Sequence, residues 1–425
     1  MTQKSITNAR IIDPQSGYDQ IGTLVITDGI ITDFGDGLTP VGEIINADGL
    51  LCTPGLIDMR VSTGEPGREN RETIATAARA AAAGGVTSIV LMPETNPVID
   101  DMSLVDFLQR RAESVPCHVY LAGALTKGLD GKSLTEIGLM SQAGAVMFSN
   151  GTVPIADAQT MRRLLAYAAN FNALIANRPQ DVDLSKGAVA HESDLSSRLG
   201  LSGAPAAAER IMAERDVALA ELTGGRLLID MISSSQALDV VRRAKSRDHD
   251  IACSVSVNHL ALNEIDIGDY RTFAKLDPPL REESDRLALL GGINDGTIDV
   301  IVSSHDPRPA GEKRLPFSEA SAGAVGLEIM LAATLTQVAD GQLDLITALA
   351  AMTCNPANLL GLSAGVIAKG APADLALIHP YQPWVCKSTD LLSRSKNTPF
   401  DGRRMTGRAI MTLCDGDIVY DGRPA

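Results

Sequence analysis

Two histidines and several aspartates lie where the sequence predicts the ends of strands, and together they could hold a divalent metal ion. His259 follows one apolar run in SVNHL, while His305 and Asp306 end another in SSHDP. Asp58 and Asp230 end two further apolar runs. The simpler interpretation is that both histidines are hydrogen-bonded polar residues, because isolated His and Asp are common at strand ends. We expect the simpler one, and we keep a metal site around His259, His305 and Asp306 as the alternative.

The segment TPGLIDMRVSTGEPG carries Arg60 and Ser62 two positions apart on a predicted strand. Residues at i and i+2 on a strand point to the same face, which is the spacing at which two side chains could bind one metal ion. A guanidinium is always cationic, and a neutral hydroxyl is a weak ligand. This strand therefore predicts no metal-binding pair.

The composition predicts a cytoplasmic α/β protein. The formal charge is −15, which argues against nucleic acid and anionic membrane surfaces as partners. Hydrophobic residues make up 45% and aromatic residues only 3%, so Ala, Val, Leu and Ile must fill the core, as in parallel α/β proteins. The six cysteines are scattered without C-x-x-C spacing, which indicates reduced, buried thiols. No segment has the composition of a signal peptide or a membrane span.

The order of predicted elements favours a (β/α)₈ TIM barrel of α/β class. The predicted barrel strands are Leu56–Met59, Ser88–Met92, Val119–Leu121, Ala145–Phe148, Ala173–Ala176, Leu227–Ile229, Cys253–Val257 and Asp299–Ser303. The predicted helices include Arg71–Ala83, Ala156–Ala169, Ala206–Leu222, Ser235–Ser246 and Glu283–Asn294. Short alternating runs at both ends predict that residues 1–52 and 366–425 form a composite β-sandwich beside a barrel of residues 53–365.

A dozen collinear segments resemble dihydroorotase of the amidohydrolase superfamily over nearly the whole chain. They include PGLIDM, EPG, ETIATAARAAAAGGVTSIVLMPETNPVID, GALTKGLDGKSLTEIGLMSQAGAVMFS, DPPLR, NPANLLGL, PADL and SKNTPF. The resemblance implies a barrel of the amidohydrolase type. It also implies zinc chemistry, because that family opens a cyclic amide with zinc-activated water and an aspartate base.

The metal-ligand and base positions of the family are all replaced in this chain. The replacing residues are Arg60, Ser62, Asn150, Arg178, Met231 and, at the base position, Ser304. Two of them are arginines, and like charges ~4 Å apart repel by about 4 kcal/mol per unit charge at an effective dielectric of 20. We therefore expect no metal site, no catalytic residues and no cofactor, with zinc as the alternative.

The positions that hold the substrate carboxylate in the family are also replaced. Gly64 stands where the family has an arginine, and Glu94 and Asp277 stand where it has asparagines. Two added carboxylates would repel an anionic substrate. The sequence therefore predicts no substrate-binding residues of the family type.

These losses suggest three hypotheses about function. The first is a catalytically inactive dihydroorotase homologue, a structural or regulatory subunit in pyrimidine biosynthesis, for which the resemblance implies aspartate transcarbamoylase as partner. The second is an active amidohydrolase that opens a cyclic amide at a rebuilt metal site. The third is a binding module in which Arg60 and Arg178 hold an anion. We expect the first, and a homo-oligomer is a further expectation.

Overall fold

A barrel of parallel strands forms the centre of the molecule, in a computed structural model that describes residues 2–247 and 250–423. Within those residues the barrel sheet has eight strands, in the spatial order β15-β14-β13-β10-β9-β8-β7-β6. Their bounds are β6 Leu56–Val61, β7 Val86–Leu91, β8 His118–Gly123, β9 Ala145–Ser149, β10 Ile175–Asn177, β13 Leu227–Ile232, β14 Ile251–Ser256 and β15 Val300–Val302. The predicted barrel is confirmed.

The sheet closes between its first and last strands. Val61 at the end of β6 forms a parallel bridge with His305, just beyond β15, and the Ser62 N–H donates to the His305 carbonyl at 2.8 Å. All strands of the barrel pair in parallel, and their residues are almost entirely buried on both faces. Continuous apolar runs of this kind are what a parallel sheet covered by helices requires.

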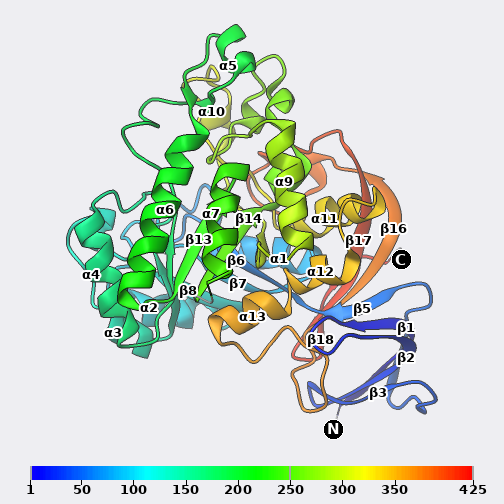
Figure 1. The fold of residues 1–425 in the computed structure, drawn as a ribbon. Helices are drawn as coiled ribbons and strands as arrows, with labels where there is room; N and C mark the ends of the chain where they lie inside the picture. Colours follow the sequence, from blue (N-terminus) through cyan, green and yellow to red (C-terminus); the bar gives the residue numbers. More distant parts are fainter. Residues whose placement is uncertain (1, 248–249, 424–425) are drawn as a thin grey trace.

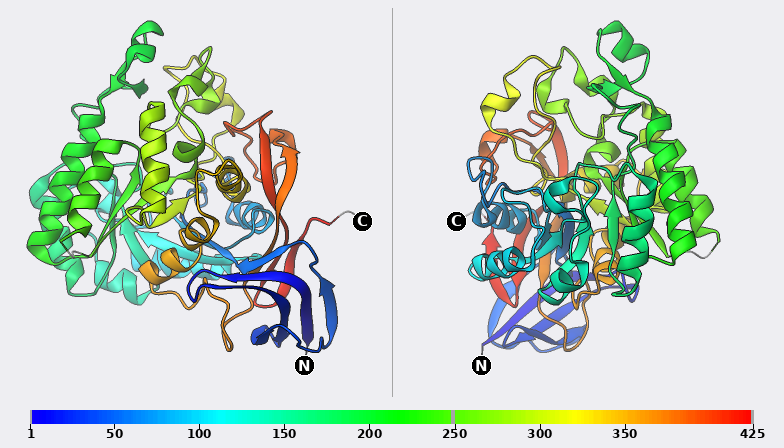
Figure 2. Two further views of the ribbon diagram at one scale, coloured as in Figure 1. Left: turned by 45° about the vertical axis from the view of Figure 1, so that its right-hand side comes forward. Right: turned by 90° about the vertical axis from the view of Figure 1, so that its left-hand side faces the viewer.

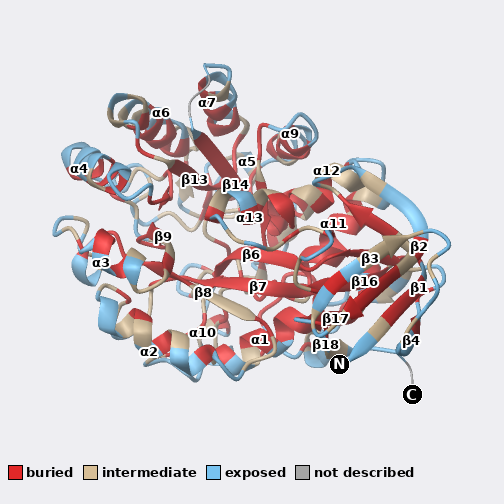
Figure 3. Cartoon of the chain, turned by 90° about the horizontal axis from the view of Figure 1, so that it is seen from below, coloured by how far each residue is buried: buried red, intermediate tan, exposed pale blue. Residues whose placement is uncertain are grey.

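Helices surround the barrel, and each turns a buried face to the strands and an exposed face to solvent, as Figure 3 shows from below. The longer helices are α1 Ile74–Ala83, α2 Met102–Ala112, α4 Ala158–Ala169, α6 Ala206–Thr223, α7 Ser235–Lys245, α9 Glu283–Asn294 and α11 Met330–Ala339. The shorter helices are α3 Ile137–Gln142, α5 Asp194–Arg198, α8 Val257–Ala261, α10 Ala310–Lys313, α12 Leu345–Ala350 and α13 Cys354–Leu360.

Side-chain caps explain where several helices begin. Helix α1 starts at Ile74 because the Thr73 hydroxyl accepts the Thr76 N–H, and the Thr76 hydroxyl accepts the Thr73 N–H in return. The Ser234 side chain caps α7 by accepting the Ala237 N–H. A cap satisfies backbone donors that have no partner within the helix, so it fixes the first turn.

The two ends of the chain meet in a second sheet beside the barrel (Figure 1). Its strands are β1 Gln3–Asp13, β2 Tyr18–Thr27, β3 Ile30–Gly35, β4 Glu43–Asn46, β5 Leu51–Pro54, β16 Leu375–Val385, β17 Arg404–Cys414 and β18 Asp417–Asp421. Strand β5 joins the two ends, since it pairs with β1 on one side and with β16 on the other. The expectation that the ends of the chain form a separate β domain is confirmed.

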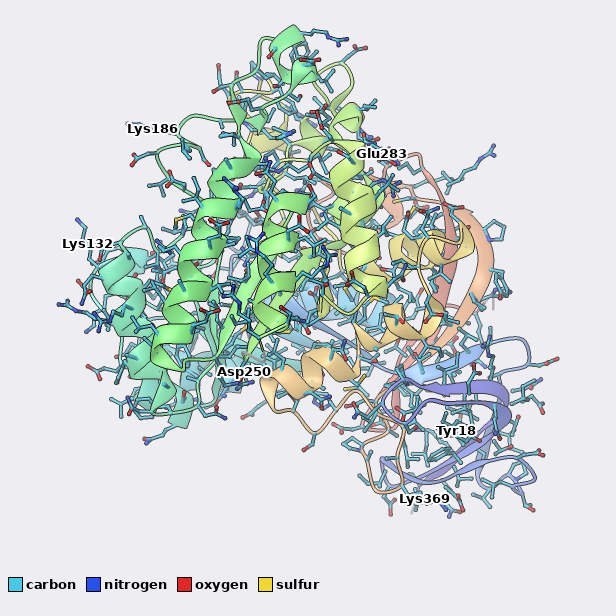
Figure 4. The ribbon with its side chains drawn as sticks, in the orientation of Figure 1. Tyr18, Lys132, Lys186, Asp250, Glu283 and Lys369 are labelled. Atoms are coloured by element: carbon cyan, nitrogen blue, oxygen red, sulfur yellow. The ribbon has the colours of Figure 1, made fainter. Side chains whose placement is uncertain are left out.

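The terminal sheet has its own small core and an exposed outer face. The rings of Tyr18 and Phe34 meet edge to face at 5.2 Å, and Lys369 pairs with Asp33 at 2.8 Å. Figure 4 shows Tyr18 and Lys369 at this end of the molecule, far from Lys132 and Lys186 on the barrel side.

The carboxyl ends of the barrel strands open toward the short helices α5 and α10. Figures 1 and 2 place these two helices at the end of the barrel opposite β1–β3. In (β/α)₈ enzymes the chemistry lies at this carboxyl end of the strands. Arg60 and Met231 are the last residues but one of β6 and β13, and His305 lies three residues beyond β15, so all three lie at this end.

Among the described residues, no helix is both long and apolar enough to cross a membrane. The six cysteines are free and buried, as the sequence predicts.

Candidate functional site at the barrel mouth

A small cavity lies at the barrel mouth between the ends of β6, β13, β14 and β15. Its walls include Arg60, Ser62, His259, Ser304 and His305. The cavity therefore brings together several of the sequence-predicted positions, namely Arg60, Ser62, Met231, Asp277 and Ser304, whereas Gly64, Glu94, Asn150 and Arg178 do not line it. Its volume of about 20 Å³ has room for about one water molecule.

Arg60 forms a buried ion pair with Asp230. Its guanidinium donates to the Asp230 carboxylate across the barrel interior, and the two side chains are 6% and 5% exposed. The other oxygen of Asp230 accepts the Ser254 hydroxyl at 2.8 Å. Arg60 is therefore neutralised within the site, and its charge would not act by itself on a metal ion.

Arg178 is neutralised in the same way by Asp277. The guanidinium, at the end of β10, donates through both terminal nitrogens to the two oxygens of the Asp277 carboxylate. Such a two-point geometry is the strongest that arginine makes with a carboxylate. Asp277 is thus the counterion of Arg178, and neither guanidinium is left free to clamp an external anion.

Asn150 has a structural role in place of ligation. Its side-chain oxygen accepts the backbone N–H groups of Leu125 and Thr126 at 3.0 and 3.1 Å, and its amide donates to the Thr126 hydroxyl at 2.7 Å. These bonds fix the loop after β8 against the end of β9. An asparagine used in this way is not available to a metal ion.

Met231 and Ser304 adopt left-handed backbone conformations, with φ of 58° and 52°. Met231 is buried in an apolar cluster inside the barrel, and its N–H donates to the Ser254 hydroxyl at 2.9 Å. Non-glycine residues with positive φ are uncommon and cluster at functional sites. The backbone is thus in an uncommon conformation at these two positions of the barrel mouth.

Glu94 turns toward the loop after β9. One carboxylate oxygen accepts the Thr152 N–H at 2.9 Å and also the Thr152 hydroxyl. Gly151 has φ of 64°, and a Cβ there would overlap the Glu94 carboxylate. Glu94 therefore needs a glycine beside it. Gly64 has φ of 152° and packs against the Arg68 carbonyl.

His305 is completely buried and faces Glu72. Its Nδ1 accepts the Gly326 N–H at 3.2 Å, so the neutral ring carries its proton on Nε2, which lies 3.6 Å from a Glu72 carboxylate oxygen. Burial raises the pKa of Glu72, but the neighbouring His305 ring and hydrogen bonds from Ser393 and Thr76 lower it by more, and the net pKa lies below its usual value. No pattern in the sequence connects Glu72 with this histidine.

His259 is a buried histidine with one bare ring nitrogen. Its Nε2 donates to the Pro279 carbonyl at 3.2 Å, and its Nδ1 has no hydrogen-bond partner among the described residues. Burial lowers the pKa of His259 to about 4, so the ring is neutral at pH 7. It can accept a hydrogen bond or a proton at Nδ1.

Asp58 lies just below the mouth. One carboxylate oxygen accepts the backbone N–H groups of Arg60 and Ser303, both at 3.2 Å, and the other has no partner among the described residues. Burial raises the pKa of Asp58 to about 6.

Another buried network, which the sequence reasoning missed, borders the mouth around Arg281. Its guanidinium donates to the Ser233 hydroxyl at 3.0 Å and to His191 Nδ1 at 2.9 Å, and it pairs with Glu209 at 3.3 Å. Glu209 in turn accepts the N–H and hydroxyl of both Ser233 and Ser234. The sequence feature that could have indicated this network is Arg281 itself, because the arginine follows apolar residues in the segment DPPLR.

The residues at the mouth do not fit a zinc ion. A zinc site needs three or four nitrogen, sulfur or oxygen ligands around one point. In the described part of the chain, no three His, Cys, Asp or Glu side chains at the mouth lie close enough together to hold one ion. His259 and His305 line one cavity, but Asp306 is paired with Arg308 at 2.6 Å. The proposed alternative ligands are thus not arranged as a ligand set.

Comparison with known proteins places the chain among dihydroorotases. The sequence model of the family described as "Dihydro-orotase-like" matches residues 49–237. The chain is similar to the dihydroorotase of Pelobacter propionicus, with 41% identity over 98% of this chain and 99% of that protein. It is 40% identical to the dihydroorotase of Citrifermentans bemidjiense over 98% of this chain and 99% of that protein.

Solved structures confirm the fold. The L-hydantoinase (dihydropyrimidinase) of Arthrobacter aurescens has a TM-score of 0.90 at 23% identity, over 99% of this chain and 97% of that one. The dihydropyrimidinase of Brevibacillus agri has a TM-score of 0.87 at 20% identity, over 99% and 95% of the two chains. At this identity the likeness concerns the fold alone.

Two expectations from the sequence are wrong in light of these comparisons. The inactive-homologue hypothesis is contradicted by full-length relatives that carry an enzyme's name, which indicate a hydrolase and favour the alternative hypothesis. The expectation of no cofactor is contradicted for the same reason, since the resemblance to that family implies zinc. The prediction failed because we took the replacement of six family positions to mean that the reaction itself is lost.

With relatives at 37–41% identity aligned along nearly its entire length, the chain belongs to the dihydroorotase family of the amidohydrolase superfamily.

Proposed function

We propose that the chain is a hydrolase that opens a cyclic amide of the dihydroorotate class at the barrel mouth. The observation that carries the proposal is the full-length similarity to dihydroorotases, at 41% identity over 98% of the chain. Zinc, when bound in this family, supplies an activated water and polarises the amide carbonyl. Because the mouth residues do not fit that ion, the proposal concerns what the side chains present there can do.

His259 is the residue that we propose as the proton acceptor. It lines the cavity, which has room for one water molecule, and its bare Nδ1 is neutral at pH 7. A buried neutral imidazole within reach of a water can take the proton that the water loses as it attacks the amide carbonyl, and it can return that proton to the ring nitrogen as the C–N bond breaks. His305 lines the same cavity, and its Nε2 lies 3.6 Å from the Glu72 carboxylate. A ring substrate needs more than about 20 Å³, so binding requires the cavity to widen.

The test is an assay of the purified full chain with dihydroorotate, a hydantoin and a dihydropyrimidine, each with and without added zinc. We expect ring opening above the uncatalysed rate for at least one substrate. His259→Gln should lower kcat by about 10²-fold or more, as for loss of a general base, without lowering Tm by more than a few degrees. His379→Ala, a histidine on β16, is the matched control. No turnover of any substrate in either condition would overturn the proposal.

Association with aspartate transcarbamoylase stays a separate prediction that rests on the family resemblance, as does homo-oligomerisation. Because we propose that the chain is an active hydrolase, the predicted complex would contain two enzymes. Co-elution of the two proteins from size-exclusion chromatography would support it, and separate elution at micromolar concentrations would contradict it. The six free cysteines support the cytoplasmic location that the sequence predicts.

A further inference from the structure

A cluster of His, Cys and Asp side chains lies at the end of the barrel opposite the mouth. His118 is the first residue of β8, at the amino end of the strand. Cys414 ends β17 and Asp415 follows it, while Asp374 directly precedes β16. Because β8 belongs to the barrel and the other elements to the terminal sheet, the cluster joins the two parts of the molecule.

The spacing within the cluster suits one metal ion. One potential ligand atom from each of His118, Cys414 and Asp415 lies within 4.8 Å of the others. His118 Nε2 lies 3.0 Å from a carboxylate oxygen of Asp374 and 3.9 Å from one of Asp415. Zinc–ligand bonds of about 2.0–2.3 Å in a tetrahedron require ligand atoms about 3.3–3.8 Å apart. Small side-chain movements would bring the ligand atoms of His118, Cys414 and Asp415 to that separation, and Asp374 lies beside His118 as a further carboxylate.

The local backbone holds three of these groups in place. Asp415 and Gly416 form the turn between β17 and β18, with φ of 48° and 77°. The other oxygen of Asp374 accepts the Asp415 N–H at 2.8 Å, and the Gly416 N–H donates to the Ala373 carbonyl at 3.1 Å. The turn is thus tied to the start of β16, which orients Cys414, Asp415 and Asp374 toward the barrel.

The chemistry of the donor set is that of a zinc site. An imidazole, a thiolate and carboxylates are the ligands that zinc takes in proteins. Cys414 and Asp374 are buried, whereas the Asp415 side chain is 66% exposed, so the cluster has a route to solvent.

We propose that His118, Asp374, Cys414 and Asp415 form a structural site for a divalent metal of the zinc type, which fastens the terminal sheet to the floor of the barrel. The site is distinct from the mouth, because β8 separates its two ends by about 17 Å over six residues. All four protein groups can ligate, which leaves no open position for catalysis.

The test uses the full chain, stripped of metal with a chelator and titrated with Co²⁺ as a spectroscopic substitute for Zn²⁺. We expect one Co²⁺ per chain, with a thiolate-to-cobalt charge-transfer absorption in the near ultraviolet. Cys414→Ser should abolish that absorption. Asp415→Asn should weaken Zn²⁺ binding by about tenfold or more, and because Asp415 is exposed this variant should still fold. Zn²⁺ should raise the Tm of the wild-type chain.

Matched controls separate this site from the mouth and from other cysteines. Cys354→Ser on α13 and His259→Gln at the mouth should leave the cobalt spectrum unchanged. A folded wild-type chain that binds neither Co²⁺ nor Zn²⁺ would overturn the proposal and reduce the cluster to a hydrogen-bonded His–Asp pair. The proposal is equally overturned if Cys414→Ser retains the absorption, or if Asp415→Asn binds Zn²⁺ with unchanged affinity. None of these outcomes depends on hydrolytic activity.

Discussion

Arg60 on β6 and Asp230 on β13 form an ion pair through the interior of the barrel, between strands that are not neighbours in the sheet. Both side chains are almost completely buried. Removal of two charges from water costs several kcal/mol per ion, and only a close partner offsets that cost. The two residues are therefore coupled, and a change in one has to be considered together with the other.

Arg60→Ala should lower the free energy of unfolding by about 3–5 kcal/mol, because it leaves the Asp230 carboxylate buried without its partner. The double variant R60M/D230L should recover most of that loss, since apolar side chains of similar size carry no desolvation cost. Urea denaturation of the three proteins measures both values. Arg242→Ala, in exposed pairs with Asp239 and Asp295, is the control and should cost less than about 1 kcal/mol. Equal losses in the single and double variants would contradict the coupling.

The ion pairs at the mouth show which part of the site the sequence could predict. The sequence predicts that Arg60, Arg178 and Met231 lie near the ends of strands, and it shows that none of them has the side chain of a good metal ligand. Their partners were not, because Arg60 and Asp230 are 170 residues apart and Arg178 and Asp277 are 99 apart. A sequence shows a buried cation without showing what neutralises it. For that reason the sequence could not show that the charge of each arginine, which we expected to repel zinc, is offset by a carboxylate partner.

The double variant R60H/R178H should gain zinc binding at the mouth. The two arginines and their partners lie close enough that Arg60 acts electrostatically on Asp277 and Arg178 on Asp230. Two histidines in their place would leave two carboxylates without cations, which together make a four-ligand set for zinc. The variant should be made in the C414S background, so that zinc counted by elemental analysis is bound at the mouth.

The control for this gain is R60M/R178M, which removes the same charge and adds no ligand. We expect Zn²⁺ to raise the Tm of R60H/R178H and not that of the control. Equal zinc content in the two variants would show that charge alone attracts the ion.

Asp58→Asn should change the pH dependence of stability. An unfolded Asp has a pKa near 3.9, and burial raises that of Asp58 to about 6. Below about pH 4 the residue is protonated in both states and has no effect. Between pH 4 and 6 the folded state keeps a proton that the unfolded state releases, so the free energy of unfolding falls as pH rises. Above pH 6 the full cost of about 2–3 kcal/mol is present.

The stability of Asp58→Asn relative to the wild type should therefore increase by about 2–3 kcal/mol from pH 4 to pH 7. Urea denaturation at these two pH values measures the difference. Asp239→Asn, an exposed carboxylate on α7, should show no such increase. If the difference in free energy of unfolding between the wild type and Asp58→Asn is the same at both pH values, the pKa of Asp58 in the folded protein is not raised.

The fold was far more predictable than the site. The predicted strand Leu227–Ile229 lies within β13 Leu227–Ile232, and the predicted helix Glu283–Asn294 has the bounds of α9. Barrel strands are buried on both faces, so their apolar runs are visible without knowledge of any partner. Short helices at the mouth, such as α5 and α10, were not predicted, because segments of four or five residues give no periodic pattern.

Gly151 and Glu94 should be energetically coupled. A Cβ at position 151 would overlap the Glu94 carboxylate, so Gly151→Ala has to displace that side chain from Thr152. The lost hydrogen bonds and the left-handed backbone should together cost about 2–4 kcal/mol. Glu94→Ala alone loses the hydrogen bonds and should cost about 1–2 kcal/mol.

In E94A/G151A the clash is absent, so the double variant should be more stable than the sum of the single losses predicts, by about 1–2 kcal/mol. Thermal or urea denaturation of the four proteins in the cycle gives this coupling energy. Strict additivity would mean that Glu94 leaves the loop freely, and that the glycine serves only the backbone angle.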